Sequence, residues 1–315
     1  MTVMVTGGAG LIGARIARNL IAKDIEVVSF DTMEDQSRLD DLRGNARLTT
    51  VGGDIRDYDS VFGTMKAHKV ERVIHMAALL APLTEQEPSL GLAVNLTGAN
   101  NVFEAARHCQ AARVVYPTSM AVYADQSEYG DAAVDEDSHR HPYNLYGYAK
   151  LMNEEVAKAY TRNFDLDTRG LRIAAVFGHG RVTGRSGAVA RLISHAAVGE
   201  PVVCDVAPDQ VTPMIYVDDV AESMARLCFT DGLDRPVYVG GNIQASVQEV
   251  ADIVHRHVPD ADIAFEPDAK PYSVIKNLDC SRFEAAVDYR LPPLKRRVLD
   301  QMNEARRERQ LPELG

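Results

Sequence analysis

The stretch Thr6-Gly7-Gly8-Ala9-Gly10-Leu11-Ile12-Gly13 decides the fold, because it joins a short apolar run to a segment with helical spacing. In such a turn, the first glycine of the triplet permits a tight bend and the second lets the backbone approach a pyrophosphate. The third lets the helix pack against the strand, and the helix N-terminus offers free N–H groups. The stretch therefore predicts a dinucleotide phosphate site formed by Gly7, Gly10, Leu11, Ile12 and Gly13.

Around this turn, short apolar strands alternate with helices. Strands are expected at 3–6, 26–30, 47–51, 72–75 and 113–117, and helices at 11–22, 58–68, 89–110 and 143–160. Crossovers of this length require a parallel sheet with helices on both faces. We predict an α/β fold, a Rossmann-type doubly wound parallel sheet over 1–176 with a smaller C-terminal substrate-binding domain. That domain is expected to comprise 177–214 and 241–315, while 215–240 returns to the sheet.

Charge and composition exclude several classes of function. Of the 315 residues, 46% are hydrophobic and 25% charged, which is typical of an ordered globular protein. The net charge of -11 argues against binding to nucleic acid or to an anionic membrane surface. The basic run at 295–309 is interleaved with acidic residues, and we interpret it as a solvated helix face.

Four widely spaced cysteines, with no C-x-x-C pair, indicate neither a disulfide framework nor a metal site; they are Cys109, Cys204, Cys228 and Cys280. Because a strand is expected at 3–6, we expect no signal peptide. No apolar run approaches the length of a membrane span. We expect a cytoplasmic protein with reduced thiols and no metal.

Two carboxylates follow the second and third strands. Asp31 stands about twenty residues after the glycine turn, where a carboxylate accepts the adenosine ribose hydroxyls. A 2′-phosphate would meet like charge there, and no Arg or Lys directly follows Asp31, so NAD is favoured over NADP. Asp54 lies at the same edge of the sheet and is placed to accept the adenine amino group. The alternative for each is a solvated loop carboxylate.

A hydroxyl, a phenol and an ammonium are expected to meet in the crevice of the sheet. Ser119 ends the fifth strand, and Tyr146 and Lys150 are separated by one helical turn. A nearby positive charge favours the phenolate and makes a tyrosine a usable base. We expect Ser119 to hold a substrate hydroxyl, Tyr146 to take its proton and Lys150 to lower the pKa of Tyr146. Alone, a Tyr-x-x-x-Lys pair is usually a surface feature.

Taken together, these motifs resemble the extended short-chain dehydrogenase/reductase family, in its epimerase/dehydratase branch. The matching segments are TGGAGLIG (6–13), GDIRD (53–57), HMAA (75–78), VNLTG (94–98), TSMAVY (118–123), YGYAK (146–150) and YVDD (216–219). The resemblance implies that Ser119, Tyr146 and Lys150 are catalytic and that Lys150 also binds the nicotinamide ribose. It also implies that Asp54, Ile55 and Ala77 border the adenosine.

Two further implications concern the helices. Asn95 resembles the asparagine that bends a helix in this family, with a helix cap or a polar core residue as the alternative. Relatives pair through two long helices, which correspond here to 89–110 and 143–160. A homodimer is therefore expected.

Departures from the family pattern bear on the substrate. Nucleotide-sugar members carry an Asn at the position of Ala175 and a diphosphate-clamping Arg at that of Thr212. A threonine cannot make a bidentate charged contact with phosphate. Another arginine remains available for that role, namely Arg181, Arg185 or Arg191.

Other stretches are nearer to L-threonine dehydrogenase-like members, at 75–88, 116–123, 212–219 and 259–268. Ala81 stands where those enzymes have a serine near the substrate, which argues against threonine itself. We expect the substrate site to comprise Ala81, Ser119, Tyr146 and Thr212, and to be small and weakly polar.

Three hypotheses follow. The first is an NAD-dependent dehydrogenase of a small secondary alcohol, such as a hydroxy acid or a sugar-derived compound. The second is a UDP-sugar 4-epimerase in which NAD is transiently reduced. The third, a non-catalytic dinucleotide sensor, is disfavoured because Tyr146 and Lys150 are both present.

Overall fold

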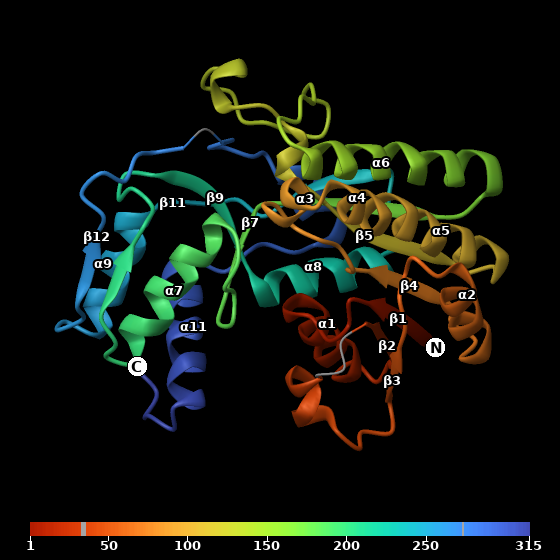
Figure 1. Ribbon diagram of the computed structural model, residues 1–315, viewed down its shortest axis with the longest axis horizontal. Coiled ribbons are helices and arrows are strands. Elements are labelled where there is room, and N and C mark those ends of the chain that lie inside the picture. The colour runs from red at the N-terminus through yellow and green to blue at the C-terminus, as the bar shows by residue number, and fades with distance from the viewer. Residues whose placement is uncertain (33–35, 273) are drawn as a thin grey trace.

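A seven-stranded parallel sheet forms the centre of the protein. In the computed structural model, which describes residues 1–32, 36–272 and 274–315, its order is β10-β6-β5-β4-β1-β2-β3 (Figure 1). Chain order reverses between β1 and β4, where sheets of this kind open a ligand crevice. The predicted α/β class is confirmed. The strands are β1 (Thr2–Thr6), β2 (Glu26–Asp31), β3 (Leu48–Gly52), β4 (Arg72–His75), β5 (Arg113–Ser119), β6 (Thr168–Ile173) and β10 (Val237–Gly240).

Helices cover both faces of this sheet, with α1 and α8 on one face and α2, α5 and α6 on the other (Figure 1). Side chains of β1 alternate accordingly: Val3 and Val5 join the core under α1, and Met4 joins the core under α5. Within the described part of the chain, no helix has the length and apolar character to cross a bilayer. The helices are α1 (Leu11–Ile21), α2 (Tyr58–Ala67), α5 (Ala99–His108), α6 (Leu145–Phe164) and α8 (Val217–Phe229).

The single helix predicted over 89–110 is interrupted. It comprises α4 (Pro88–Leu92), a π-helical segment (Ala93–Gly98) and α5. Asn95 is buried in that segment, and its side-chain amide accepts from the Leu79 N–H and donates to the Leu79 carbonyl, both at 2.8 Å. Asn95 thus ties the wider π turn to the chain that leaves β4.

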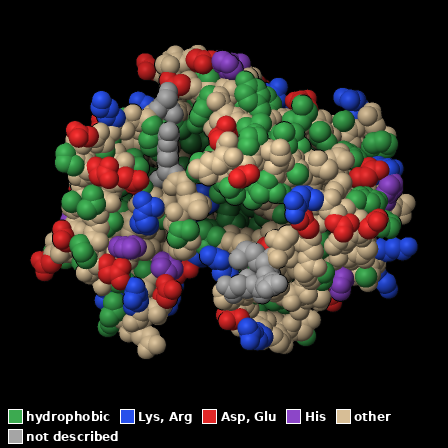
Figure 2. All heavy atoms as spheres, viewed as in Figure 1, with side chains coloured by type: hydrophobic (Ala, Val, Ile, Leu, Met, Phe, Trp, Pro, Cys, Tyr) green, Lys and Arg blue, Asp and Glu red, His purple; other side chains and the backbone are tan. Residues whose placement is uncertain are grey.

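A second half of the molecule packs beside the sheet, and Figure 2 shows that the surface is hollowed between the two halves. A three-stranded sheet in the order β11-β9-β7 and a parallel β12-β8 pair are its strands. From β9 the chain returns through α8 to β10 at the edge of the central sheet. The elements of this half are β7 (Ala175–Phe177), α7 (Arg185–Ala197), β8 (Val202–Cys204), β9 (Val211–Tyr216), β11 (Ile243–Ser246), α9 (Val247–His257), β12 (Ile263–Phe265), α10 (Ser281–Val287) and α11 (Leu294–Glu308). The short helix α3 (Leu83–Gln86) lies in the first half.

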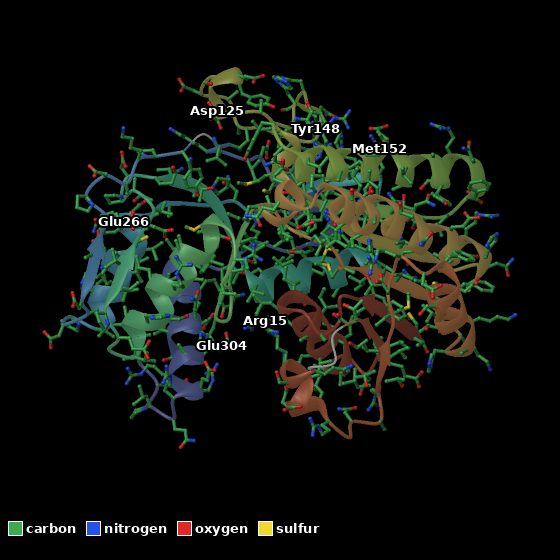
Figure 3. All side chains as sticks on the ribbon, in the orientation of Figure 1. Arg15, Asp125, Tyr148, Met152, Glu266 and Glu304 are labelled. Carbon is green, nitrogen blue, oxygen red and sulfur yellow. The ribbon has the colours of Figure 1, made fainter. Side chains whose placement is uncertain are left out.

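Ion pairs join the two halves. Arg15 of α1 pairs with Asp218 of α8 at 2.7 Å within the first half and with Glu304 of α11 in the second, and Arg15 and Glu304 face each other between the halves (Figure 3). Arg297 of α11 donates from Nε to Oδ2 of the fully buried Asp219 at 2.9 Å. The interpretation of the 295–309 run as a solvated face is wrong at Arg297, because this guanidinium supplies the counter-charge of a buried carboxylate.

Candidate active site

The glycine turn between β1 and α1 fits a dinucleotide phosphate. Gly7 adopts a φ of +67°, and a Cβ added there would lie 2.8 Å from the Ala77 nitrogen. A Cβ on Gly13 would lie 2.0 Å from the Gly7 carbonyl oxygen. Gly10 precedes α1 without a side-chain cap, and the first turn of α1 has no acidic residue. The N–H groups of that turn therefore remain available to an anion.

The carboxyl ends of β2 and β4 lie beside this turn. Asp31, at the end of β2, accepts a hydrogen bond from the Ala9 N–H at 3.0 Å. Ala77 follows β4 and donates its N–H to Thr6 Oγ1 at 3.2 Å, which holds it against Gly7. Asp31, whose carboxylate can accept hydrogen bonds from hydroxyl groups, and the backbone of Ala77 therefore lie at the same edge of the sheet as the phosphate turn.

The segment after β3 supplies the other two residues expected near the adenosine. Asp54 accepts a hydrogen bond from Arg56 Nε at 2.8 Å, and this bond holds the pKa of Asp54 below its usual range. Ile55 is buried, and its side chain packs against Gly98 at the end of the π-helical segment. The ionised Asp54 remains a hydrogen-bond acceptor, so the acceptors at this edge fit an adenosine.

Ser119, Tyr146 and Lys150 line one cavity of about 320 Å³ together with the glycine turn. Ser119 is the last residue of β5, and its Oγ accepts from the Ala121 N–H at 3.1 Å. Tyr146 lies in the first turn of α6, which begins after Asn144 caps the Gly147 N–H at 2.8 Å. The Tyr146 phenol lies close enough to Ser119 for that hydroxyl to lower the pKa of Tyr146.

The Lys150 Nζ lies 5.6 Å from the centroid of the Tyr146 ring. Burial raises the pKa of Tyr146, while the interaction with Ser119 and the charge of Arg181 lower it. The Lys150 ammonium donates to the Pro117 carbonyl at 3.0 Å, and burial lowers its own pKa to about 8. Arg181 is thus a cation whose charge lowers the pKa of Tyr146, and the effect of Lys150 on that pKa stays a prediction.

His75, at the end of β4, does not carry a charge near neutral pH. Burial, followed by the nearby Lys150 ammonium, lowers the pKa of His75 to about 3. Its Nδ1 lies 2.7 Å from Thr6 Oγ1. A neutral, hydrogen-bonded imidazole in this place helps to hold the strand ends and carries no proton-transfer role in the arrangement described here.

Much of the cavity lining is apolar. Ala81 and Ala175 line it, as does a group that sequence reasoning missed, namely Leu80, Ile173, Val176, Val274 and Ile275. Thr212 is not among the lining residues. It is buried on β9, and its hydroxyl has no hydrogen-bond partner among the described residues. No sequence signal marks Val274 and Ile275, which belong to an irregular segment before α10.

The three arginines considered as phosphate ligands differ in position. Arg181 lines the cavity, whereas Arg191 does not and pairs with Asp205 at 3.2 Å. The side chain of Arg185 lies outside what the structure describes. Arg181 stands in the glycine-rich loop between β7 and α7, so that only the folded chain reveals its place.

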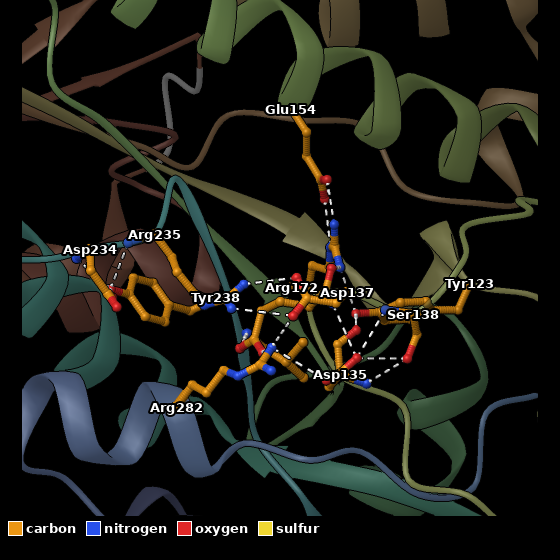
Figure 4. Close-up of polar contacts among 12 residues, drawn as sticks. Tyr123, Asp135, Asp137, Ser138, Glu154, Arg172, Asp234, Arg235, Tyr238 and Arg282 are labelled. Carbon is orange, nitrogen blue, oxygen red and sulfur yellow. Dashed lines mark hydrogen bonds and ion pairs between the residues drawn. The ribbon is translucent and has the colours of Figure 1, made fainter.

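A buried polar network supports the catalytic elements from behind (Figure 4). Arg172 of β6 donates from Nε to Glu154 of α6 at 2.9 Å and from Nη1 to the Tyr123 hydroxyl at 2.7 Å. Thr118, next to Ser119, donates to Glu154 at 2.8 Å. Because Glu154 is one helical turn beyond Lys150, the network couples the end of β5 to the face of α6 that carries Lys150.

These features define a nicotinamide-dinucleotide enzyme with a Ser–Tyr–Lys site. The sequence profile of the NAD dependent epimerase/dehydratase family matches residues 3–239, and the chain belongs to that family. Its cofactor is accordingly NAD. The resemblance to extended short-chain dehydrogenases/reductases is confirmed.

Relatives with two different activities are similar to this chain. A Methanocaldococcus jannaschii protein, provisionally described as a UDP-glucose 4-epimerase, is 28% identical over 81% of this chain and 82% of its own length. The L-threonine dehydrogenase structure from Clostridium difficile superposes with a TM-score of 0.86 at 22% identity, covering 99% of each chain. The Thermus thermophilus UDP-glucose 4-epimerase complex with NAD superposes with a TM-score of 0.84 at 24% identity, covering 97% of this chain and 99% of the other. These structural likenesses establish the fold.

Proposed function

We propose that the protein is an NAD-dependent dehydrogenase acting on a secondary alcohol carbon of a small substrate, a hydroxy acid or a sugar-derived compound. The observation that carries this proposal is the single cavity shared by Ser119, Tyr146, Lys150 and the glycine turn. If the phenol of Tyr146 and the glycine turn lay in separate places, the phenol could not reach a substrate bound beside the cofactor. A shared cavity allows the proton and the hydride to be removed from the same alcohol group.

In this proposal the Ser119 hydroxyl holds the substrate oxygen, and the Tyr146 phenolate removes the proton from that oxygen. The C–O bond becomes a carbonyl as the carbon loses its hydrogen with both electrons. When bound, NAD supplies the acceptor for that hydride. Lys150 retains donors for a ribose hydroxyl, and Arg181 offsets the cost of charging the buried phenol.

A panel of secondary alcohols with NAD tests this function. We expect net formation of NADH, followed by its absorbance, with at least one small hydroxy acid or polyol. Cofactor that stays bound through purification, without net reduction by any alcohol, would contradict a dehydrogenase.

The second candidate is a UDP-sugar 4-epimerase. The presence of Arg181 in the cavity favours this candidate, because Arg181 is a cation that can bind phosphate. The position of Thr212 argues the other way, because relatives supply their diphosphate clamp there. An epimerase would interconvert UDP-glucose and UDP-galactose, and either sugar would raise the melting temperature beyond the rise given by NAD. We expect neither effect.

We also propose that the protein works in the cytoplasm as a homodimer. The four cysteines are free thiols, which suits a reducing compartment. Tyr148 and Met152 project outward from α6 and are 52% and 53% exposed (Figure 3). These two large apolar side chains lie one turn apart on α6, the helix that corresponds to one through which relatives pair. They support an interface on the outer face of α6.

A further inference from the structure

We propose that Arg181 binds a carboxylate of the substrate, so that the substrate is a hydroxy acid and not a neutral alcohol. This inference rests on the proposed dehydrogenase function and names its substrate class. It assigns to Arg181 the recognition of the group that lies beyond the reacting carbon.

The loop between β7 and α7 carries Arg181 into the cavity. Gly178, Gly180 and Gly184 in this loop have positive φ values of 152°, 81° and 73°, so the chain makes turns that other residues rarely adopt. The Cβ position of Gly180 lies 3.4 Å from the side chain of Leu11, at the start of α1. Arg181 is therefore held between the glycine turn and the catalytic tyrosine.

The charge balance of the cavity is positive. Lys150 and Arg181 are the charged side chains in its described lining, which contains no Asp or Glu. Lys150 already donates to the Pro117 carbonyl. Arg181 is thus the cation beside the reacting phenol whose N–H groups remain available to bind a ligand.

The guanidinium of Arg181 has no carboxylate partner among the described residues, unlike other largely buried arginines of the chain. Its Nε is buried without a hydrogen-bond partner in the described structure, and no ion pair involving Arg181 occurs there. Arg113, Arg172 and Arg297, by contrast, each pair with a carboxylate of the same chain. Burial of an unpaired charge is costly, and an incoming anion removes that cost.

A carboxylate suits this place better than a nucleotide diphosphate. The cavity of about 320 Å³ has to accommodate the nicotinamide end of the cofactor as well as the substrate. Most of its lining is apolar, and its remaining hydroxyls belong to Thr118, Tyr123, Tyr143 and Ser186. A planar carboxylate matches the two-pronged donor geometry of a guanidinium in a small space, whereas a nucleoside would need polar contacts for its base.

Kinetics of an acid and its neutral analogue test the assignment. In Arg181→Met, kcat/KM for 3-hydroxybutyrate should fall on the order of 10²-fold, as expected when one partner of a buried charge pair is removed. The value for methyl 3-hydroxybutyrate or 2-butanol should fall much less, because these neutral substrates lose only the effect of the Arg181 charge on Tyr146. Arg181→Lys should recover part of the loss, and Arg191→Met, outside the cavity, should behave as the wild type.

Three results would overturn the assignment. A matching loss of NADH affinity in Arg181→Met would place the guanidinium on the cofactor diphosphate. An equal loss with acid and neutral substrates would mean that Arg181 acts only through Tyr146. Wild-type turnover confined to neutral alcohols would show that no carboxylate is recognised.

A binding measurement separates this inference from the proposed function. With NADH present, butyrate should raise the melting temperature of the wild type and not that of Arg181→Met. If no alcohol reduces NAD but this difference persists, the dehydrogenase function fails and the carboxylate site stands. If turnover occurs with no effect of butyrate, the carboxylate site fails alone.

Discussion

At the scale of single residues, the proposed chemistry depends on the phenol of Tyr146. Tyr146→Phe removes only the oxygen that transfers the proton, so turnover should fall by about 10²–10⁴-fold or more while NADH affinity is retained. Tyr148→Phe, on the exposed side of the same helix, is the matched control and should keep wild-type rates. Steady-state kinetics and a fluorescence titration with NADH measure the two effects, and near-normal rates in Tyr146→Phe would remove the mechanism.

At the same scale, we expect Lys150 to make the binding of NADH depend on pH. Because burial lowers its pKa to about 8, the ammonium is present below that pH and is lost as the pH rises through it. The dissociation constant of NADH should therefore rise on the alkaline side of pH 8 in the wild type. Lys150→Met should bind NADH weakly at every pH, without this alkaline change, whereas Lys158→Met should keep it. Survival of the change in Lys150→Met would assign it to another group.

At the scale of elements, the register of α6 against β5 and β6 depends on one buried carboxylate. Glu154 is fully buried and accepts from both Arg172 and Thr118. Glu154→Gln should lower the free energy of unfolding by about 3–5 kcal/mol, because the Arg172 charge stays buried without its partner. Glu155→Gln, an exposed neighbour paired with Lys158, should cost less than about 1 kcal/mol. Denaturant unfolding compares them, and equal costs would contradict the role of the network.

At the scale of the whole molecule, the outer face of α6 is the expected dimer interface. A lysine at an interface core would bury an unpaired charge, so Met152→Lys should convert a dimer to a monomer at micromolar concentration. Val203→Lys places the same charge on a 62% exposed position of the second half and should leave the mass unchanged. Light scattering after size exclusion gives the masses. A wild-type monomer would refute the proposed dimer.

Much of this architecture follows from sequence alone, because its signals are local. The strands and helices of the first half follow from apolar periodicity, and the parallel sheet follows from the length of the crossovers. Glycine spacing identifies the phosphate turn, since only glycine avoids the clash of 2.0 Å at position 13. The Tyr146–Lys150 pair follows from the pitch of one helix.

The tertiary structure alone decided the far end of the site, because irregular segments have no period from which their packing can be read. It placed Arg181 beside Tyr146, brought Val274 and Ile275 to the cavity, and kept Thr212 inside β9. It also reversed the expectation that Arg297 lies on a solvated helix face, because Arg297 pairs with the buried Asp219. Charge effects depend on which groups burial brings together, and that depends on contacts between residues far apart in the chain.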